Sequence, residues 1–517
     1  MFERIAVAAG LFFLLCTGGY AETICVWRDN SGVRHFADVC PPGERCRCRK
    51  TKLQDSSTDT TSGGTTDSGT TSTTSDTSTS TTTTADSTTS SGTTSGTTST
   101  TGGTSTSSTT GTTQTYVTGY VTDGGVFAPP STGTYAYNAF KPGAAGFPAV
   151  GGTYTDPVFG GTVKRLTNIG ATSNAEDIYA KHQANANGTL AFHRSSAGVR
   201  IINVNTGAIA YPSQPAGAYA AEMHWDALDP DKYYYFSGTN LVRRNLAAQT
   251  NTTIKTFPST LQANGGSLNI QSRDGRYFTV RYGGTNKVWD SQLDIIYAGA
   301  VTPTSTGGWT SITPDGNYLV TSGSQQRSYR IDHTTRTISG TAVMFWSLCG
   351  DHGALISASN GKSYMVTFNC YSGVPGVYRV DITLNQAGRT VAQQLADNTL
   401  LVPLQWSDAG HMSAVSRGPL ADWVFMSPES TTDTFDSSTA GWTVYKQEIL
   451  AINVVTLEVR RLAHHRSRSI TANYYNMPRV STSWDGSVVM WTSNYDTSSP
   501  AGYSDMYAIQ YPVGASW

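Results

Sequence analysis

Four of the nine histidines stand at similar distances ahead of a turn sequence that recurs along the chain. They are His182 before Gly188, His224 before Asp231, His352 before Gly361 and His411 before Ala421. Imidazole transfers protons near neutral pH, ligates divalent metals and donates hydrogen bonds to anions or sugars, so a cluster of four could serve any of these roles. Each histidine taken alone could equally be a polar side chain that lines a solvated funnel.

The turns that follow these histidines recur with a regular period. They are Asn187-Gly188, Pro230-Asp231, Asp274-Gly275, Pro314-Asp315-Gly316, Asn360-Gly361, Leu420-Ala421-Asp422 and Asp485-Gly486. Gly, Asn and Asp tolerate the positive φ that hairpin turns require. Roughly 41 to 45 residues separate the first five turns and about 60 the last ones, a spacing typical of four-stranded propeller blades. The sequence therefore predicts an all-β fold with a seven-bladed β-propeller over residues 116–517, and an insertion at Pro428–Gly441.

The two ends of this domain are expected to close the ring. Only two strands fit after Asp485-Gly486, the last at Asp505–Gln510, so the missing strand should come from Thr162–Thr167. Closure of this kind leaves no long exposed sheet edge. Four further runs are expected as outer strands of their blades: Val199–Val204, Ser328–Asp332, Val377–Asp381 and Ile449–Asn453.

The first strand of each blade starts at the mouth of the central channel and runs to the hairpin turn. Residues six to nine places before each turn should therefore lie together at the mouth. The seventh blade contributes Tyr475, Asn476 and Arg479 at this level. We expect His352 and His411 to be proton-transfer or metal groups. Tyr475 would act as an acid and Arg479 would pair with a carboxylate, which guanidinium geometry suits.

Aromatic side chains accompany these histidines, and His182 and His224 are expected to bind substrate together with them. Trp225 follows His224, and Trp346 and Trp406 precede the histidines of the fifth and sixth blades. An aromatic face beside a polar donor suits stacking on a sugar ring, although a buried tryptophan in a propeller is also common packing.

A cysteine pair flanks the turn of the fifth blade. Cys349 lies about eleven residues before Asn360-Gly361 and Cys370 about ten after it, so the two should face each other across the hairpin. We expect a disulfide bond that stiffens the mouth next to His352.

Several segments near the C-terminus are similar to the oligogalacturonate-lyase type of propeller. They are Arg461-Leu-Ala-His464-His465-Arg466-Ser, Asn476-Met-Pro478-Arg479-Val-Ser-Thr-Ser-Trp-Asp485-Gly486, Trp491-Thr-Ser493-Asn494 and Gly410-His411-Met-Ser-Ala. The resemblance implies β-elimination on an acidic polysaccharide. In such a reaction a base removes the proton beside the uronate carboxylate, and a cation or metal stabilises the developing charge.

The resemblance also implies a metal-binding histidine at His411, but the Mn²⁺ site of that family uses two more histidines and a glutamine just before the last hairpin. Here the run Tyr474–Arg479 contains no histidine. Either His352, His464 or His465 completes a set with His411 for Mn²⁺ or Ca²⁺, or Arg479 replaces the metal as the charge neutraliser.

The N-terminal part of the chain has a different character. Arg4, the apolar run Ile5–Leu15 and Gly19-Tyr20-Ala21 predict a signal peptide over residues 1–21. Residues 22–50 form a small module held by its cysteines (Cys25, Cys40, Cys46 and Cys48), whose spacings favour disulfides over a zinc site. The run from Trp27 to Asp38, with Pro41-Pro42 after it, resembles a bacterial envelope module of unknown function, which implies residence in the envelope. Residues 51–115 are almost wholly Ser, Thr, Gly and Asp and are expected to be a disordered linker.

Net charge and the missing motifs exclude several classes of protein. The chain contains 35 Lys and Arg residues and 36 Asp and Glu residues. The resulting net charge of −1 argues against a nucleic-acid partner. No apolar stretch after the signal peptide is long enough to anchor the chain in a membrane. Serine hydrolase, nucleotide-binding and common metalloprotease motifs are missing. We therefore expect a secreted, periplasmic or surface-bound bacterial protein.

Three functions remain open. The first is a lyase-like propeller that acts on an extracellular, uronate-containing polysaccharide. The second is a non-catalytic propeller that binds glycan or protein at the cell surface. The third is a purely structural envelope protein with an empty channel mouth.

Overall fold

The computed structural model describes residues 119–168, 181–195, 198–217, 222–264, 268–303, 308–348, 352–369, 375–405 and 410–511. It also gives the backbone of four strands, β1 (Thr23–Arg28), β2 (Arg34–Ala37), β3 (Arg47–Lys50) and β6 (Ala175–Glu176). The propeller unit begins at Tyr116, and the three N-terminal strands belong to a separate unit. No helix among the described residues is long and apolar enough to cross a membrane.

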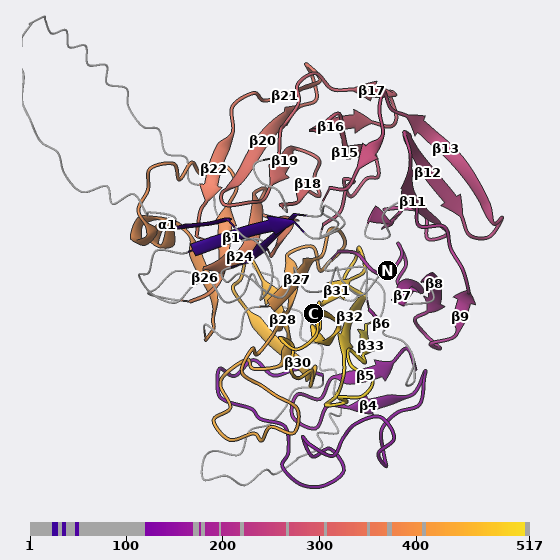
Figure 1. The fold of residues 1–517 in the computed structure, drawn as a ribbon, viewed down its shortest axis with the longest axis vertical. Helices are drawn as coiled ribbons and strands as arrows, with labels where there is room; N and C mark the ends of the chain where they lie inside the picture. Colours follow the sequence, from indigo (N-terminus) through magenta and orange to yellow (C-terminus); the bar gives the residue numbers. More distant parts are fainter. Residues whose placement is uncertain are drawn as a thin grey trace, which may run out of the picture. The chain divides into compact units, whose positions relative to one another are not determined.

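Seven sheets surround a common centre and form a seven-bladed β-propeller (Figure 1). Blade 1 contains β6, β7 (Leu190–Ser195), β8 (Gly198–Asn203) and β9 (Ile209–Tyr211). Blade 2 contains β10 (His224–Trp225), β11 (Lys232–Ser237), β12 (Asn240–Asn245) and β13 (Thr250–Thr256). Blade 3 contains β14 (Leu261–Gln262), β15 (Tyr277–Tyr282), β16 (Thr285–Asp290) and β17 (Ile295–Ile296).

Blades 4 to 6 follow in chain order. Blade 4 contains β18 (Thr310–Ile312), β19 (Tyr318–Thr321), β20 (Gln326–Asp332), β21 (Thr337–Ile338) and β22 (Val343–Trp346). Blade 5 contains β23 (Gly353–Ser357), β24 (Ser363–Asn369), β25 (Gly376–Asp381) and β26 (Thr399–Pro403), with helix α1 (Val391–Asp397) before the last strand. Blade 6 contains β27 (Gly410–Ala414), β28 (Trp423–Pro428), β29 (Glu448–Asn453) and β30 (Val459–His464).

Blade 7 joins the two ends of the domain, as the sequence predicted. Its strands are β31 (Ser481–Thr482), β32 (Val488–Ser493), β33 (Asp505–Gln510), β5 (Thr162–Arg165) and β4 (Thr153–Thr155). β33 pairs with β5 in the register Tyr507↔Arg165. Arg165 also donates to the buried Asp505 carboxylate at 2.7 Å, so an ion pair reinforces the closure.

The seven predicted turns all lie between the first and second strands of their blades, which confirms the blade count. Gly486 shows why the sequence places glycine at such a turn. Its φ is +76°, and a Cβ at this position would lie 2.8 Å from Val415 Cγ2. The turn therefore needs glycine both for the left-handed backbone and for the close approach of blade 6.

The four runs expected as outer strands are β8, β20, β25 and β29, the third strands of blades 1, 4, 5 and 6. Each of these four blades has a further strand outside its third strand. Sequence periodicity located these strands correctly, but it missed the short outermost ones. Strands such as β9 and β21 are too short, or too exposed, to carry an apolar pattern.

Several predictions fall on residues that the structure does not describe. The signal peptide and the linker lie outside the described residues, as do Cys349 and Cys370, so the disulfide bond stays a prediction. In the N-terminal unit β1 pairs with both β2 and β3, and the register places Cys25 opposite Cys48.

Candidate functional site

The centre of the candidate site is a pair of histidines from neighbouring blades. His352 immediately precedes β23, and His411 lies in β27. Their rings pack together with centroids 4.1 Å apart and an interplanar angle of 31°. Because both residues precede their turns by similar intervals, the first strands of blades 5 and 6 carry them to the same level.

Glu429 completes this group and was not predicted. It follows β28 directly, and its Oε1 lies 2.6 Å from His411 Nδ1, with both side chains almost fully buried. The hairpin register of blade 6 places Ser427 opposite His411, so an acidic residue two positions later falls beside the histidine. The sequence contains this signal, but Glu429 falls within the predicted insertion Pro428–Gly441, where no strand register is expected.

Burial sets the protonation of the three groups. It lowers the pKa of His352 to about 3, an effect that the neighbouring His411 reinforces. Burial and the charge of Arg479 hold the pKa of His411 well below its usual range. Burial also raises the pKa of Glu429 to about 8. At neutral pH both imidazoles are therefore neutral, and the short contact between His411 and Glu429 holds one proton.

Arg479 reaches this cluster from blade 7. Its backbone has φ +42°, a left-handed conformation that ordinary residues seldom adopt. The guanidinium lies over the ring of Tyr474, 4.3 Å from its centroid, and the residue is fully buried. The next residue, Val480, donates its N–H to Ser427 Oγ on β28 at 3.2 Å, which fixes this bend against blade 6.

A second guanidinium, that of Arg194 near the end of β7, lies near enough to Arg479 for the two charges to interact. Burial lowers the pKa of Arg194, and the charge of Arg479 lowers it further, whereas Tyr474 and Tyr475 act in the opposite direction. An anion between two like charges relieves their repulsion, so the pair suits a carboxylate. Arg194 was also missed, although it lies as far beyond the turn at Gly188 as His182 lies before it.

The structure does not bring His182 into this group. Its Nε2 lies 2.8 Å from Ser416 Oγ and its Nδ1 3.2 Å from the Thr482 carbonyl oxygen. The ring also packs on Trp484, with centroids 4.3 Å apart. His182 therefore bridges the inner strands of blades 6 and 7, and the expectation that it binds substrate with His352 and His411 was wrong.

The histidines proposed to complete a metal site are also engaged elsewhere. His464 contacts Asp156 through Nδ1 and the Phe127 carbonyl through Nε2. His465 contacts the Pro428 carbonyl through Nε2 and accepts the N–H of Ser467 at Nδ1. The described part of the chain contains no group of three or more His, Cys, Asp or Glu side chains placed to hold a metal ion. The predicted set of His352, His411, His464 and His465 is therefore not assembled.

Two of the three predicted sugar-stacking tryptophans belong to the core. Trp225 is buried, stacks on Phe192 at 4.3 Å and donates its indole N–H to the Gln183 carbonyl. Trp346 is fully buried and donates to the Phe368 carbonyl. Neither has a face that a ligand can reach, so the packing alternative is correct for both. Trp406 lies outside the described residues.

The remaining predicted residues lie near the two arginines or in blade 2. Tyr475 and Asn476 belong to the short 3-10 helix η5 (Tyr474–Asn476) just before Arg479. Asn476 is buried and donates to the Ser469 carbonyl, so its role is structural. Tyr475 is half-buried. His224 lies in β10 beside Glu222, apart from the His352–His411 pair.

Comparison with known proteins adds fold-level matches. An oligogalacturonate lyase from Vibrio parahaemolyticus aligns with 70% of this chain and 96% of its own, at 9% identity and a TM-score of 0.46. An oligogalacturonate lyase in complex with manganese aligns over the same shares at 13% identity and a TM-score of 0.45. The tricorn protease aligns with 64% of this chain and 34% of its own, at 12% identity and a TM-score of 0.36. No protein-family model and no curated protein sequence matches.

Taken together, His352, His411, Glu429, Arg479 and Arg194 form a site of defined chemistry. It combines two guanidinium groups with neutral imidazole and a buried, protonated carboxyl group. Such a site can hold a carboxylate and move a proton next to it.

Proposed function

We propose that this chain is an extracellular polysaccharide lyase that cleaves a uronate-containing glycan by β-elimination. The grouping of Arg194 with Arg479, and of Arg479 with the neutral His411–His352 pair, carries the proposal. A lyase of this kind needs a cation for the uronate carboxylate and a base for the adjacent proton, and the site offers both.

In the proposed reaction the carboxylate of a uronate unit lies against Arg479 and Arg194, which makes the neighbouring C5–H more acidic. His352 accepts this proton, the C5–H electron pair forms the C4=C5 double bond, and the C4–O bond breaks. The leaving oxygen takes a proton from Tyr475. The anionic substrate would itself raise the pKa of His352 from its low value, because a nearby negative charge favours the protonated ring.

His411 and Glu429 hold the proposed base, His352, in position. The ring of His411 lies against that of His352, and its own orientation is fixed by the Glu429 carboxyl group. The described residues do not fit a metal ion at this place, and no step of the proposed reaction uses one.

The test is to incubate the mature chain with a panel of uronate polysaccharides, with and without Mn²⁺ or Ca²⁺, and to follow the ultraviolet absorbance of the unsaturated sugar. His352→Ala is expected to lose roughly 10²- to 10⁴-fold in rate, as is typical for removal of a proton-transfer group. Arg479→Lys should lose at least about tenfold, because an ammonium cannot pair with a carboxylate in the bidentate manner. His333→Gln, in blade 4, is the matched control and should leave the rate unchanged.

Absence of product across the panel would contradict the lyase proposal. Retention of one glycan on an affinity gel would then favour the alternative function, a non-catalytic glycan- or protein-binding propeller at the cell surface. The same arginines would hold the glycan in that case, so Arg479→Lys should release it.

Export and attachment remain parts of the proposal. The expected signal peptide and the resemblance of residues 22–50 to an envelope module support a location outside the cytoplasm, with the N-terminal module in contact with the cell envelope. Cell fractionation of the producing bacterium tests both.

A further inference from the structure

A groove between blades 4 and 5 opens on the face of the propeller that carries the hairpin turns. It encloses about 430 Å³, which lies within the range of roughly 300–1,000 Å³ for ligand pockets. Its walls come from the turn and the third strand of blade 4 and from the turn of blade 5, and include Asp315, Asn317, Tyr318, Arg330, Asp332 and Gly361. The structure describes every residue of these segments. The groove is therefore a space large enough for a sugar unit.

One wall of the groove places an aromatic ring, a cation and an anion side by side. Tyr318 lies opposite Arg330 in the register of β19 and β20, so their Cβ atoms are about 5 Å apart. Asp332 follows Arg330 by two residues and therefore points to the same side of β20. Tyr318 packs against the buried cluster that includes Phe345 and Trp346, which fixes its ring. Arg330 is exposed and can turn toward a ligand.

Asp332 is a carboxylate at neutral pH. The N–H groups of Thr335 and Thr334 donate to its Oδ1 at 2.9 and 2.8 Å. These bonds and the charge of Arg330 hold the pKa of Asp332 below its ordinary value. Two carboxylate oxygens offer about four acceptor positions, so Asp332 keeps the capacity to accept hydrogen bonds from hydroxyl groups in the groove.

The floor of the groove is fixed, and the opposite wall leaves room. Asp315 accepts hydrogen bonds from Asn317 Nδ2 at 2.9 Å and from Ser363 Oγ at 3.1 Å, which ties the turn of blade 4 to blade 5. Gly361 faces open space, because a Cβ at this position would meet no atom within 4 Å. The groove therefore exists without rearrangement of either blade.

These groups suit one uronate unit. The guanidinium of Arg330 can pair with the sugar carboxylate in the bidentate manner. The carboxylate of Asp332 accepts bonds from the ring hydroxyl groups, and the ring of Tyr318 offers an apolar face for the C–H side of the sugar. A small inorganic anion fits less well, because the negative charge of Asp332 would repel it.

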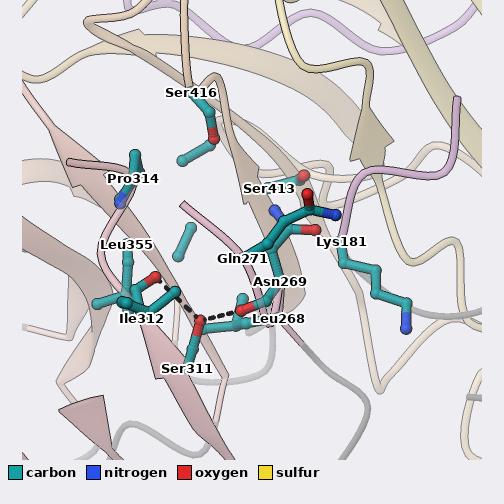
Figure 2. A pocket seen from close by; sticks show the side chains of 12 residues that line it. Lys181, Leu268, Asn269, Gln271, Ser311, Ile312, Pro314, Leu355, Ser413 and Ser416 are labelled. Carbon is teal, nitrogen blue, oxygen red and sulfur yellow. Dashed lines mark hydrogen bonds between the residues drawn. The ribbon is translucent and has the colours of Figure 1, made fainter. Parts of the chain in front are cut away.

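The groove is separate from the candidate site. The turn that contains Gly361 and the imidazole of His352 lie at opposite ends of β23, whose five residues span roughly 17 Å. The centre of the propeller does not connect them, because side chains from blades 1, 3, 4, 5 and 6 converge there (Figure 2). They leave only about 20 Å³, enough for a single water molecule. A ligand in the groove therefore binds independently of one at the mouth.

We propose that the groove formed by Tyr318, Arg330 and Asp332 is a second glycan-binding site, which takes a uronate unit on the face opposite the mouth. This inference rests on the proposed function for the nature of the ligand. Such a site keeps the protein on a polysaccharide while another stretch of glycan occupies the mouth.

Titration calorimetry of trigalacturonic acid with the full chain tests the groove. His352→Ala serves as the background, so that the ligand is not cleaved. Two molecules should bind per chain. Adding Arg330→Ala should weaken one site roughly tenfold to a hundredfold, the range for a lost hydrogen bond to a charged group, and leave the other unchanged. Adding Arg479→Lys should weaken only the other site. Maltotriose, which has hydroxyl groups but no carboxylate, should bind the groove more weakly than trigalacturonic acid by a similar factor.

Arg336→Ala is the matched control, because Arg336 is an exposed arginine of the same blade that does not line the groove. It should leave both sites intact. Weakening as large as that by Arg330→Ala would show a general effect of charge and overturn the groove. A single site that only Arg479→Lys weakens would also overturn it and leave the lyase proposal standing. Binding at the groove by a protein that forms no unsaturated product would retain the groove and reject the lyase reaction.

Discussion

Replacing Glu429 with glutamine removes a buried carboxyl group whose pKa in the folded protein is about 8, against an ordinary value of 4.5. Between these values the folded protein holds a proton that the unfolded chain has lost. The contribution of this group to stability is therefore complete below pH 4.5 and is lost as the pH rises through 8. The loss amounts to about 1.4 kcal/mol per pH unit.

The comparison with Glu429→Gln isolates this effect from the other buried groups. The pKa of His352 is lowered from 6.5 to about 3, so this histidine is neutral in the folded state from pH 6.5 to 8, while the unfolded chain releases its remaining proton near pH 6.5. The pKa of the buried Lys181 is lowered from 10.5 to about 8, so this lysine begins to lose its proton in the folded state near pH 8. Both changes are common to wild type and the variant, so they cancel in the comparison. Between these two pH values wild type should lose about 2 kcal/mol from Glu429 alone, and Glu429→Gln should lose none of it.

Urea unfolding followed by tryptophan fluorescence at pH 6.5 and 8 measures this difference. The comparison uses the change in unfolding free energy between the two pH values, so a general destabilisation by the substitution does not enter. Glu458→Gln is the control, because Glu458 is a partly exposed residue that pairs with Arg460 on the surface of blade 6. A decline in Glu429→Gln as large as in wild type would refute the assignment of a protonated carboxyl group to the His411 contact.

Three further predictions concern the frame of the propeller. Gly486→Ala should destabilise the fold by about 2–4 kcal/mol in urea unfolding, because it combines a left-handed backbone with a 2.8 Å approach to Val415. Asp505→Asn should cost about 3–5 kcal/mol by the same measure, since it leaves the buried guanidinium of Arg165 without its carboxylate. Acidification should unfold the chain steeply below pH 6.5, as followed by circular dichroism, because buried neutral histidines each take up a proton when the chain unfolds. Burial lowers the pKa of six histidines in the folded state: His182, His193, His224, His352, His411 and His465.

The blade count could be predicted from the sequence because hairpin turns are local. Residues such as Gly188 and Gly486 report the turn by their own conformational freedom, and no distant contact is needed to interpret them. Ring closure by Thr162–Arg165 followed from the same count, since one blade lacked a strand. The pairing of His352 with His411 was predictable for a related reason, because the first strands of blades 5 and 6 are regular between the mouth and the turn.

Counting residues from the turn could not show which way the ring of His182 faces. Its Nδ1 lies 3.2 Å from the Thr482 carbonyl oxygen, and the neighbouring Gln183 donates its N–H to Ser481 Oγ, both in blade 7. These contacts with a blade that is distant in the sequence hold the ring between the inner strands, and the turn period carries no information about them.

The tryptophans were misplaced because sequence position does not distinguish a ring that faces the channel from one that fills the space between blades. Trp225 packs on Phe192 of blade 1, and Trp346 packs on Tyr378 of blade 5. Both lie near the mouth in the sequence, but their rings turn into the inter-blade core, where a large apolar side chain contributes most to stability.

The position of Arg479 depends on contacts that begin far from it in the sequence. Arg468 packs over the ring of Tyr137 at 3.4 Å and donates to the Tyr137 carbonyl, which fixes the loop after β30 against the segment that precedes blade 7. Within that loop Ser467 Oγ donates to the Asn476 carbonyl, and Asn476 donates back to Ser469 at 2.8 Å. These bonds hold η5, and η5 sets the start of the left-handed bend at Arg479. The residues around Tyr137 are therefore part of the support of the candidate site, although they belong to no blade.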